Sequence, residues 1–287
     1  MKEDTTSGIL KRLEDQKKEE GGLPLLLEFY YELLETQSEA LKRLAAPKTA
    51  WSKDTILKRI QNGLPPIGFN ELDPYWPLVQ DFFPRVINVF AKYPGLFGEP
   101  AARLKEKDSG RVITKKAIEA WFNGKDLPSI FLGGASKNLM SAIIQATIQP
   151  FLANYARALI SHIEQELWRR GYCPICGGVP DLALIKGEHG ARWLLCSRCD
   201  TEWLFQRLEC PYCGTQEQND LAFFTDDNEQ YRLYVCEQCK CYLKAIDLRK
   251  AQSEILPPLE RIYTLDLDTQ ARERGYHSCQ KPAVKSK

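Results

Sequence analysis

The sequence predicts an α+β fold, in which a multihelical N-terminal domain precedes two tandem metal-binding modules and a short C-terminal helix. Three observations support this prediction. The first 172 residues contain no cysteine and repeat apolar side chains at helical spacing. Eight of the ten cysteines then form four Cys-x-x-Cys pairs, beginning at Cys173. The segments between these pairs are short apolar runs bounded by turn residues, as in β-hairpins.

The N-terminal domain is predicted to be helical because three long segments share an amphipathic pattern. Residues 23–46, 75–93 and 136–170 place apolar side chains on one face of a helix. Pro84 and Pro150 fall inside the last two segments, so we expect a kink or a break at each proline. This half contains neither a phosphate-binding glycine loop nor a His-Glu-x-x-His motif. We therefore expect it to present a surface to a partner rather than to carry chemistry.

The eight paired cysteines fall into two sets with similar spacing. Nineteen residues separate the two pairs of the first set, which are Cys173, Cys176, Cys196 and Cys199. Twenty-two residues separate the two pairs of the second set, which are Cys210, Cys213, Cys236 and Cys239. This spacing is typical of zinc-ribbon-like sites, because each Cys-x-x-Cys turn directs two sulfurs at one ion. The order predicts two sequential four-cysteine sites, although an interleaved pairing has the same spacings and stays open.

These patterns divide the chain into four predicted domains. Their boundaries are 1–168 for the helical domain, 169–204 for the first module, 205–250 for the second module, and 251–287 for the C-terminal helix and tail. Strands are expected at 182–185, 191–196, 221–224, 231–236 and 241–248. The modules are too short and too polar to form two independent hydrophobic cores, so bound metal is expected to stabilise them.

Disulfides and thioredoxin-like redox pairs are competing interpretations of the same cysteines. Disulfides rarely persist in the cytosol, and a thioredoxin-like pair follows a strand and opens a helix. Neither fits two sets of pairs placed around hairpins. Cys241 and Cys279 lie outside the spacing, and we expect Cys241 to be a spare thiol and Cys279 to belong to a polar tail. His189 is not expected to be a ligand, because each set already supplies four cysteines.

The charge of the cysteine-rich region disfavours nucleic acid as a partner. Residues 172–250 contain nine Lys and Arg against twelve Asp and Glu, a formal balance of −3. Each divalent ion held by four thiolates contributes −2, so two filled sites bring the region to about −7. Nucleic-acid-binding modules are usually basic. A cationic protein segment is the better electrostatic match.

The chain is expected to be cytoplasmic and not inserted in a membrane. No segment reaches the roughly 18 consecutive apolar residues of a membrane span. The first twenty residues are charged throughout and lack the apolar centre of a signal peptide.

The centre of the cysteine-rich half resembles the FdhE family of formate dehydrogenase accessory proteins. The run RWLLCSRCDTEWLFQRLECPYCG, from Arg192 to Gly214, contains a Cys-x-x-Cys, Thr-Glu-Trp, a basic residue and the next Cys-x-x-Cys in the order of that family. The flanking GYCPICGGVP and CEQCKCYLKAID also fit, as does the tail RIYTLDLDTQARERGY. The specific resemblance covers residues 170–277, and Cys241 departs from it.

The resemblance implies two rubredoxin-like modules with iron in both four-cysteine sites. Zinc is the alternative metal, because both ions accept tetrahedral thiolates. It also implies a non-enzymatic maturation protein that binds the catalytic subunit of a respiratory, twin-arginine-exported formate dehydrogenase and is needed for its assembly. That subunit is the expected partner, and homodimerisation stays open.

Two other functions stay open beside the accessory role. Rubredoxin-like electron transfer needs a reversible ferric/ferrous site, and a ribbon-type nucleic-acid binder is the interpretation that the charge disfavours. The family motif residues Thr201, Glu202 and Trp203 have two interpretations of equal weight. They either contact the client, or they support the fold, with Trp203 covering the first metal site and Glu202 bonding a nearby strand or Arg207.

Overall fold

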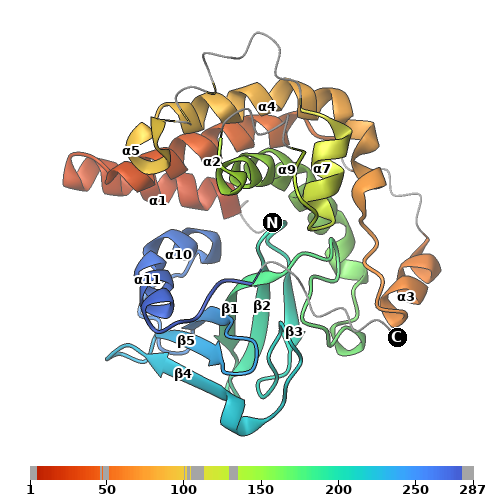
Figure 1. Ribbon diagram of the computed structural model, residues 1–287, viewed down its shortest axis with the longest axis vertical. Helices are drawn as coiled ribbons and strands as arrows, with labels where there is room; N and C mark the ends of the chain where they lie inside the picture. The colour runs from red at the N-terminus through yellow and green to blue at the C-terminus, as the bar shows by residue number, and fades with distance from the viewer. Residues whose placement is uncertain are drawn as a thin grey trace. The chain divides into compact units, whose positions relative to one another are not determined.

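The computed structural model describes residues 5–45, 47, 52–99, 101, 104, 113–128 and 135–279 of the chain. The chain divides into two units, one formed by residues 1–47 and 68–154 and the other by residues 48–67 and 155–287. The described part of the first unit is helical, whereas the second contains a β-sheet followed by short helices (Figure 1). This order of helical region, sheet region and C-terminal helices confirms the predicted α+β class.

The first unit is built from amphipathic helices that each bury one face. Its helices are α1 (Thr5–Glu20), α2 (Leu25–Arg43), α4 (Trp76–Ala91), α5 (Pro94–Phe97), α7 (Lys115–Phe122) and the greater part of α9 (Lys137–Leu159). Helix α2 contacts both α1 and α4. In the core, the ring of Phe29 packs edge-on against Phe90 and Phe97, with centroids 4.9 and 4.7 Å apart.

Three of these helices match the long predicted segments, whereas α1, the one-turn helix α5 and one helix of the second unit were not predicted. Helices α2, α4 and α9 correspond to the three amphipathic patterns, although α9 ends at Leu159 and is followed by two 3-10 turns. Helix α1 and helix α3 (Lys53–Gln61) of the second unit were missed. Each buries only two apolar side chains, which leaves a weak periodic signal in the sequence.

The two prolines lie inside continuous helices rather than at breaks. Pro84 is within α4 and Pro150 is within α9. Pro150 has no N–H to donate to the carbonyl of Ala146, four residues earlier in the helix. The buried side chain of Gln37, on α2, donates its Nε2–H to that carbonyl at 2.8 Å. A side chain from another helix therefore replaces the missing backbone donor.

The second unit contains a six-stranded sheet with the order β3-β2-β1-β6-β5-β4. The strands are β1 (Pro180–Lys186), β2 (Ala191–Cys196), β3 (Glu202–Phe205), β4 (Leu221–Thr225), β5 (Tyr231–Cys236) and β6 (Tyr242–Asp247). Five of them were predicted, and β3 was not. Its sequence EWLF follows the second cysteine pair directly, and its Trp203 and Phe205 are buried on one face.

The sheet shows that one three-stranded arrangement occurs twice. Strands β1, β2 and β3 form one antiparallel triplet, and strands β4, β5 and β6 form the other. In both triplets the first strand begins opposite a cysteine, since Pro180 pairs with Cys196 and Leu221 pairs with Cys236. A parallel pairing of β1 with β6 joins the triplets into one sheet. The predicted boundaries between the modules stay predictions.

The predicted C-terminal helix is present as two short helices, α10 (Pro257–Tyr263) and α11 (Leu265–Glu273). They are attached to β6 by buried polar contacts. Lys244 Nζ lies 2.7 Å from the carboxylate of Asp268 and donates to the carbonyls of Arg261 and Thr264 at 3.3 Å. The hydroxyl of Tyr242 donates to the same aspartate at 2.7 Å. Each of these buried polar groups is thus compensated.

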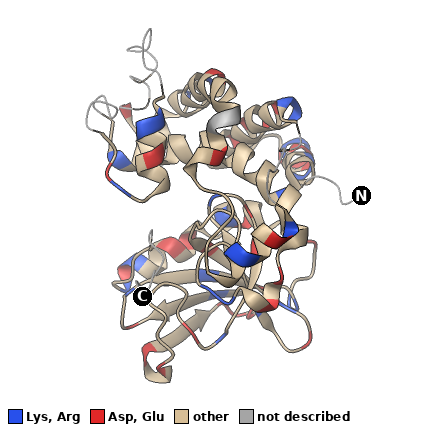
Figure 2. Ribbon diagram, turned by 90° about the vertical axis from the view of Figure 1, so that its right-hand side faces the viewer, with Lys and Arg blue, Asp and Glu red and all other residues tan. Residues whose placement is uncertain are grey.

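Charged residues of both signs are distributed over the helices and loops, whereas the strands carry few of them (Figure 2). This pattern agrees with the near-neutral total of 39 Lys and Arg against 38 Asp and Glu. Among the helices that the structure describes, none has both the length and the apolar character required to cross a membrane.

Candidate metal centres

The paired cysteines come together in two groups of four at the ends of the strands. One group is Cys173, Cys176, Cys196 and Cys199, and the other is Cys210, Cys213, Cys236 and Cys239. We call them the first and second tetracysteine clusters. The pairing is therefore sequential, and the interleaved alternative is excluded. Each cluster could hold a metal ion, and the use of the eight cysteines as ligands remains a proposal.

The sulfur positions fit a tetrahedral ion. Four sulfurs at about 2.3 Å from a central ion lie roughly 3.7 Å from one another. In the first cluster Cys173 Sγ lies 3.6 Å from Cys199 Sγ. In the second, Cys210 Sγ lies 3.7 Å from Cys239 Sγ, and the remaining pair is 3.6 Å apart. These separations are too long for disulfides and match tetrathiolate coordination.

All four Cys-x-x-Cys turns have the same backbone structure. The N–H of the first cysteine donates to the carbonyl five residues later, and the N–H four residues later donates back to the carbonyl of that cysteine. The residue after each second cysteine has a positive φ, with values of 70° at Gly177, 57° at Asp200, 75° at Gly214 and 56° at Lys240. Glycine adopts this conformation at little cost, which explains the two glycines in the motif.

The first cluster also offers hydrogen-bond donors to its sulfurs. The backbone N–H groups of Ile175 and Arg198 donate to Cys173 Sγ at 3.4 Å and to Cys196 Sγ at 3.3 Å. The hydroxyl of Thr201 lies 3.1 Å from Cys199 Sγ. Such donors stabilise thiolates. Burial alone acts in the opposite direction and raises the pKa of the Cys173 thiol well above its usual value, so a cation is needed to balance the charge.

The two clusters differ in exposure to solvent. All four cysteines of the first are buried, whereas Cys213 and Cys239 of the second are partly exposed. Four sulfurs complete the tetrahedron in each cluster and leave no coordination position for a substrate. The arrangement suits structural support or electron exchange rather than Lewis-acid catalysis.

Arg261 of α10 supports the first cluster from outside. Its guanidinium donates to Asp181 at 2.8 Å, to Asp200 at 2.6 Å and to the carbonyl of Cys196 at 2.8 Å. Burial lowers the pKa of Arg261, but the two carboxylates outweigh that effect and raise it above its ordinary value. Sequence reasoning did not single out this arginine, although it begins the tail RIYTLDLD that carries part of the family resemblance.

The three family motif residues after the second cysteine pair have structural contacts. Thr201 and Trp203 are buried, and Trp203 Nε1 donates to the carbonyl of Arg170 at 2.8 Å. Glu202 forms an ion pair with Lys186 on β1, rather than with Arg207. These contacts support the structural interpretation of the motif.

A third cluster was missed by the sequence reasoning. Cys241, His277 and Cys279 place their ligand atoms within 4.8 Å of one another. Cys241 and Cys279, expected to be unrelated thiols, are bonded as a disulfide. The sequence contains Cys-x-Cys at 239–241 and His-x-Cys at 277–279. Because these two motifs lie far apart in the chain, their spacing did not indicate that they form one cluster. Among the described residues, no candidate cluster includes His189.

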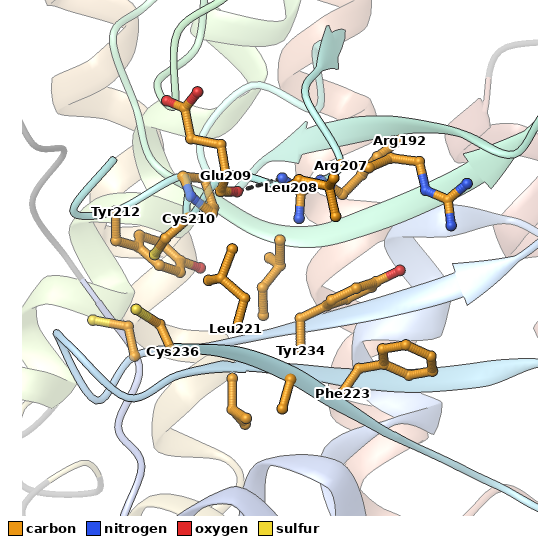
Figure 3. A pocket seen from close by; sticks show the side chains of 15 residues that line it. Arg192, Arg207, Leu208, Glu209, Cys210, Tyr212, Leu221, Phe223, Tyr234 and Cys236 are labelled. Carbon is orange, nitrogen blue, oxygen red and sulfur yellow. Dashed lines mark hydrogen bonds between the residues drawn. The ribbon is translucent and has the colours of Figure 1, made fainter. Parts of the chain in front are cut away.

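A small apolar pocket adjoins the second cluster. It has a volume of about 180 Å³, and Figure 3 shows Leu208, Leu221, Phe223 and Tyr234 around it. Cys210, Cys236 and Cys241 also line it. Ligand pockets usually measure about 300–1,000 Å³, so this one is too small for a typical cofactor and fits a single apolar side chain.

Comparisons with known proteins point to one family. A model of the FdhE central domain matches residues 172–207. The chain is 30% identical over 257 residues to a "Protein FdhE homolog" of Aquifex aeolicus, covering 88% of this chain and 85% of that protein. A Shewanella oneidensis protein with the same description is 27% identical over 264 residues, covering 86% and 78% of the two chains.

A solved structure has the same fold. The crystal structure of the FdhE protein from Pseudomonas aeruginosa matches with a TM-score of 0.62 at 21% identity, covering 98% of this chain and 94% of the other. At this identity the match supports the fold alone.

Proposed function

The chain belongs to the FdhE family, and on that premise we propose that it is a cytoplasmic accessory protein that binds the catalytic subunit of a formate dehydrogenase. Binding would serve the assembly of a respiratory enzyme that is exported by the twin-arginine route, and the accessory protein itself would not catalyse a reaction. The observation that carries this proposal is the pair of complete four-sulfur clusters in a chain of this family. Since a closed site cannot bind substrate, function is assigned to the surface that the sites stabilise.

The surface around β4 is our choice for the docking site of the client. Strand β4 lies at the edge of the sheet, so one side of its backbone can pair with an added strand. Phe223 and Phe224 point to opposite faces of the strand and are 50% and 42% exposed. Leu208, at the rim of the pocket beside the second cluster, is 65% exposed. Exposed apolar groups of this kind are typical of interaction sites.

Replacing Leu208 by Ser should weaken client binding about tenfold, equivalent to ~1.4 kcal/mol, because an apolar contact is lost. The measurement is the affinity of the purified full-length chain for the catalytic subunit of formate dehydrogenase, by calorimetry or co-purification. Leu64→Ser is the matched control, since Leu64 is 51% exposed and does not line the pocket. Failure of the wild-type chain to bind the subunit would overturn the proposed function. If Leu208→Ser and Leu64→Ser bound the catalytic subunit with equal affinity, the docking site would lie elsewhere on the surface.

Electron transfer is a second candidate function, which the partial exposure of Cys213 and Cys239 favours. An iron ion in the second cluster would lie close enough to the surface to exchange an electron with a partner. This candidate also requires iron rather than zinc, because zinc has no redox chemistry in this setting.

Iron is the metal that we propose for both tetracysteine clusters. Anaerobic purification should yield two iron ions per chain and visible thiolate charge-transfer bands that bleach on reduction. The measurement is elemental analysis combined with spectra of the oxidised and reduced protein. Two colourless zinc ions, found after expression in an iron-replete host, would exclude electron transfer and leave the clusters as structural elements.

A further inference from the structure

The cluster of Cys241, His277 and Cys279 has no role in the function proposed above. Its two cysteines form a disulfide with Cα atoms 5.7 Å apart, and His277 Nε2 lies 3.9 Å from Cys241 Sγ. We propose that these three residues form a third metal site in the reduced protein, selective for a soft divalent cation such as zinc. The disulfide is the oxidised, metal-free state of that site.

Backbone contacts other than the disulfide bring Cys241 and His277 together, and Cys279 follows His277 two residues later. Helix α11 ends at Glu273, and Gly275 just beyond it has a φ of +85°, which turns the chain back towards the sheet. The N–H of His277 then donates to the carbonyl of Lys240 at 2.9 Å, and the N–H of Tyr242 donates to the carbonyl of His277 at 3.2 Å. Cys241 and His277 thus form a parallel β-bridge. Because these contacts involve the backbone alone, reduction of the disulfide does not remove them.

The geometry accommodates an ion after a small shift. With zinc–sulfur and zinc–nitrogen bonds of about 2.3 and 2.0 Å, a tetrahedral ion places its sulfur and nitrogen ligands roughly 3.5 Å apart. The observed separation between Cys241 Sγ and His277 Nε2 is 3.9 Å. The two sulfurs must separate from bonding distance to roughly 3.7 Å, which rotation about the Cα–Cβ bonds of Cys241 and Cys279 permits.

The third site differs in kind from the tetracysteine clusters. Two thiolates and one imidazole supply three protein ligands, so the fourth position is left for water or for a group from a partner. His277 is exposed and Cys279 is half-buried, which gives solvent access to that position. Mixed sulfur and nitrogen donors favour zinc over the hard cations magnesium and calcium.

Oxidation of Cys241 and Cys279 is coupled to release of the metal ion, and the electrons and bonds balance. A small-molecule disulfide such as oxidised glutathione accepts two electrons, and its S–S bond breaks to give two thiolates. The thiolates of Cys241 and Cys279 supply these electrons and form one S–S bond between them, through a mixed disulfide. The zinc ion leaves because a disulfide sulfur carries no negative charge with which to bind it.

The test is the metal content of the full-length chain in both redox states. The chain is reduced anaerobically with a phosphine, equilibrated with zinc and desalted, and total iron plus zinc is measured. We expect three ions per wild-type chain and two per chain in Cys279→Ser. Oxidised glutathione should then remove one ion from the wild type, and mass spectrometry of the intact denatured chain should show the loss of two hydrogens.

Two histidine variants separate metal binding from disulfide formation. His277→Ala should retain the disulfide under oxidation but bind the third ion more than about tenfold more weakly after reduction. His189→Ala, which alters an exposed histidine outside the clusters, should keep three ions. Equal metal content in reduced wild type and Cys279→Ser would overturn the third site. Unchanged affinity for the third ion in His277→Ala would overturn the three-ligand set.

Discussion

Replacing Cys199 by Ser is expected to remove the metal from the first tetracysteine cluster and to unfold the triplet of β1, β2 and β3. Cys199 is buried, and its sulfur lies 3.6 and 3.5 Å from those of Cys173 and Cys176. Structural metal ions contribute on the order of 10 kcal/mol to folding. That contribution is as large as the whole stability of a typical domain, which is about 5–15 kcal/mol. Elemental analysis and hydrogen exchange of the three strands are the measurements.

The second cluster provides the comparison for this result. Cys239→Ser should also lose one ion, but with a smaller loss of structure, because Cys239 is partly exposed and β4, the edge strand of that triplet, is largely exposed. His189→Ala, which alters an exposed residue outside all three clusters, serves as the control. If Cys199→Ser kept both ions and the hydrogen-exchange protection of the wild type, the first cluster would not be a metal site that stabilises the fold.

Replacing Gly171 by Ala is expected to destabilise the second unit by about 3 kcal/mol or more. A Cβ atom at Gly171 would lie 1.9 Å from the carbonyl oxygen of Pro211, which belongs to the backbone of the third cysteine turn. Neither backbone can move without displacing Cys173 or Cys210 of the two clusters. Thermal unfolding should show a melting temperature lowered by about 10 °C, with metal released at lower temperature.

Two further glycines test the same argument. Gly22→Ala should leave the melting temperature unchanged, because a Cβ atom there would have nothing within 4 Å and the backbone φ is not positive. Gly178→Ala should selectively weaken the first cluster, since its Cβ would approach Cys196 Sγ to 2.9 Å. If Gly171→Ala and Gly22→Ala had the same melting temperature, the backbone segments at Gly171 and Pro211 would be able to move apart without a loss of stability.

Local patterns in the sequence were sufficient for five of the six strands of the sheet and for helices α2, α4 and α9. Five strands were predicted because each is a short apolar run next to a cysteine turn, and helices α2, α4 and α9 because their apolar faces are long. Strand β3 was missed because four residues, Glu202–Phe205, carry little periodic signal. The sequence predicted a kink or a break at Pro150, and α9 continues through this residue, where Gln37, more than a hundred positions away, supplies a donor in place of the missing backbone N–H.

The sequence by itself determined the α+β class, the eight cysteines that form the candidate sites and their near-duplicate arrangement. These features depend on spacings within about 30 residues, where the geometry of a turn or a hairpin decides which side chains meet. Only the tertiary structure decided the sequential grouping of the cysteines, the parallel pairing of β1 with β6, and the contact of Arg261 with the first cluster. It also decided the meeting of Cys241 with His277 and Cys279, across 36 and 38 positions. Contacts at such separations depend on how α10 and α11 pack on the sheet, and no local pattern in the chain encodes that packing.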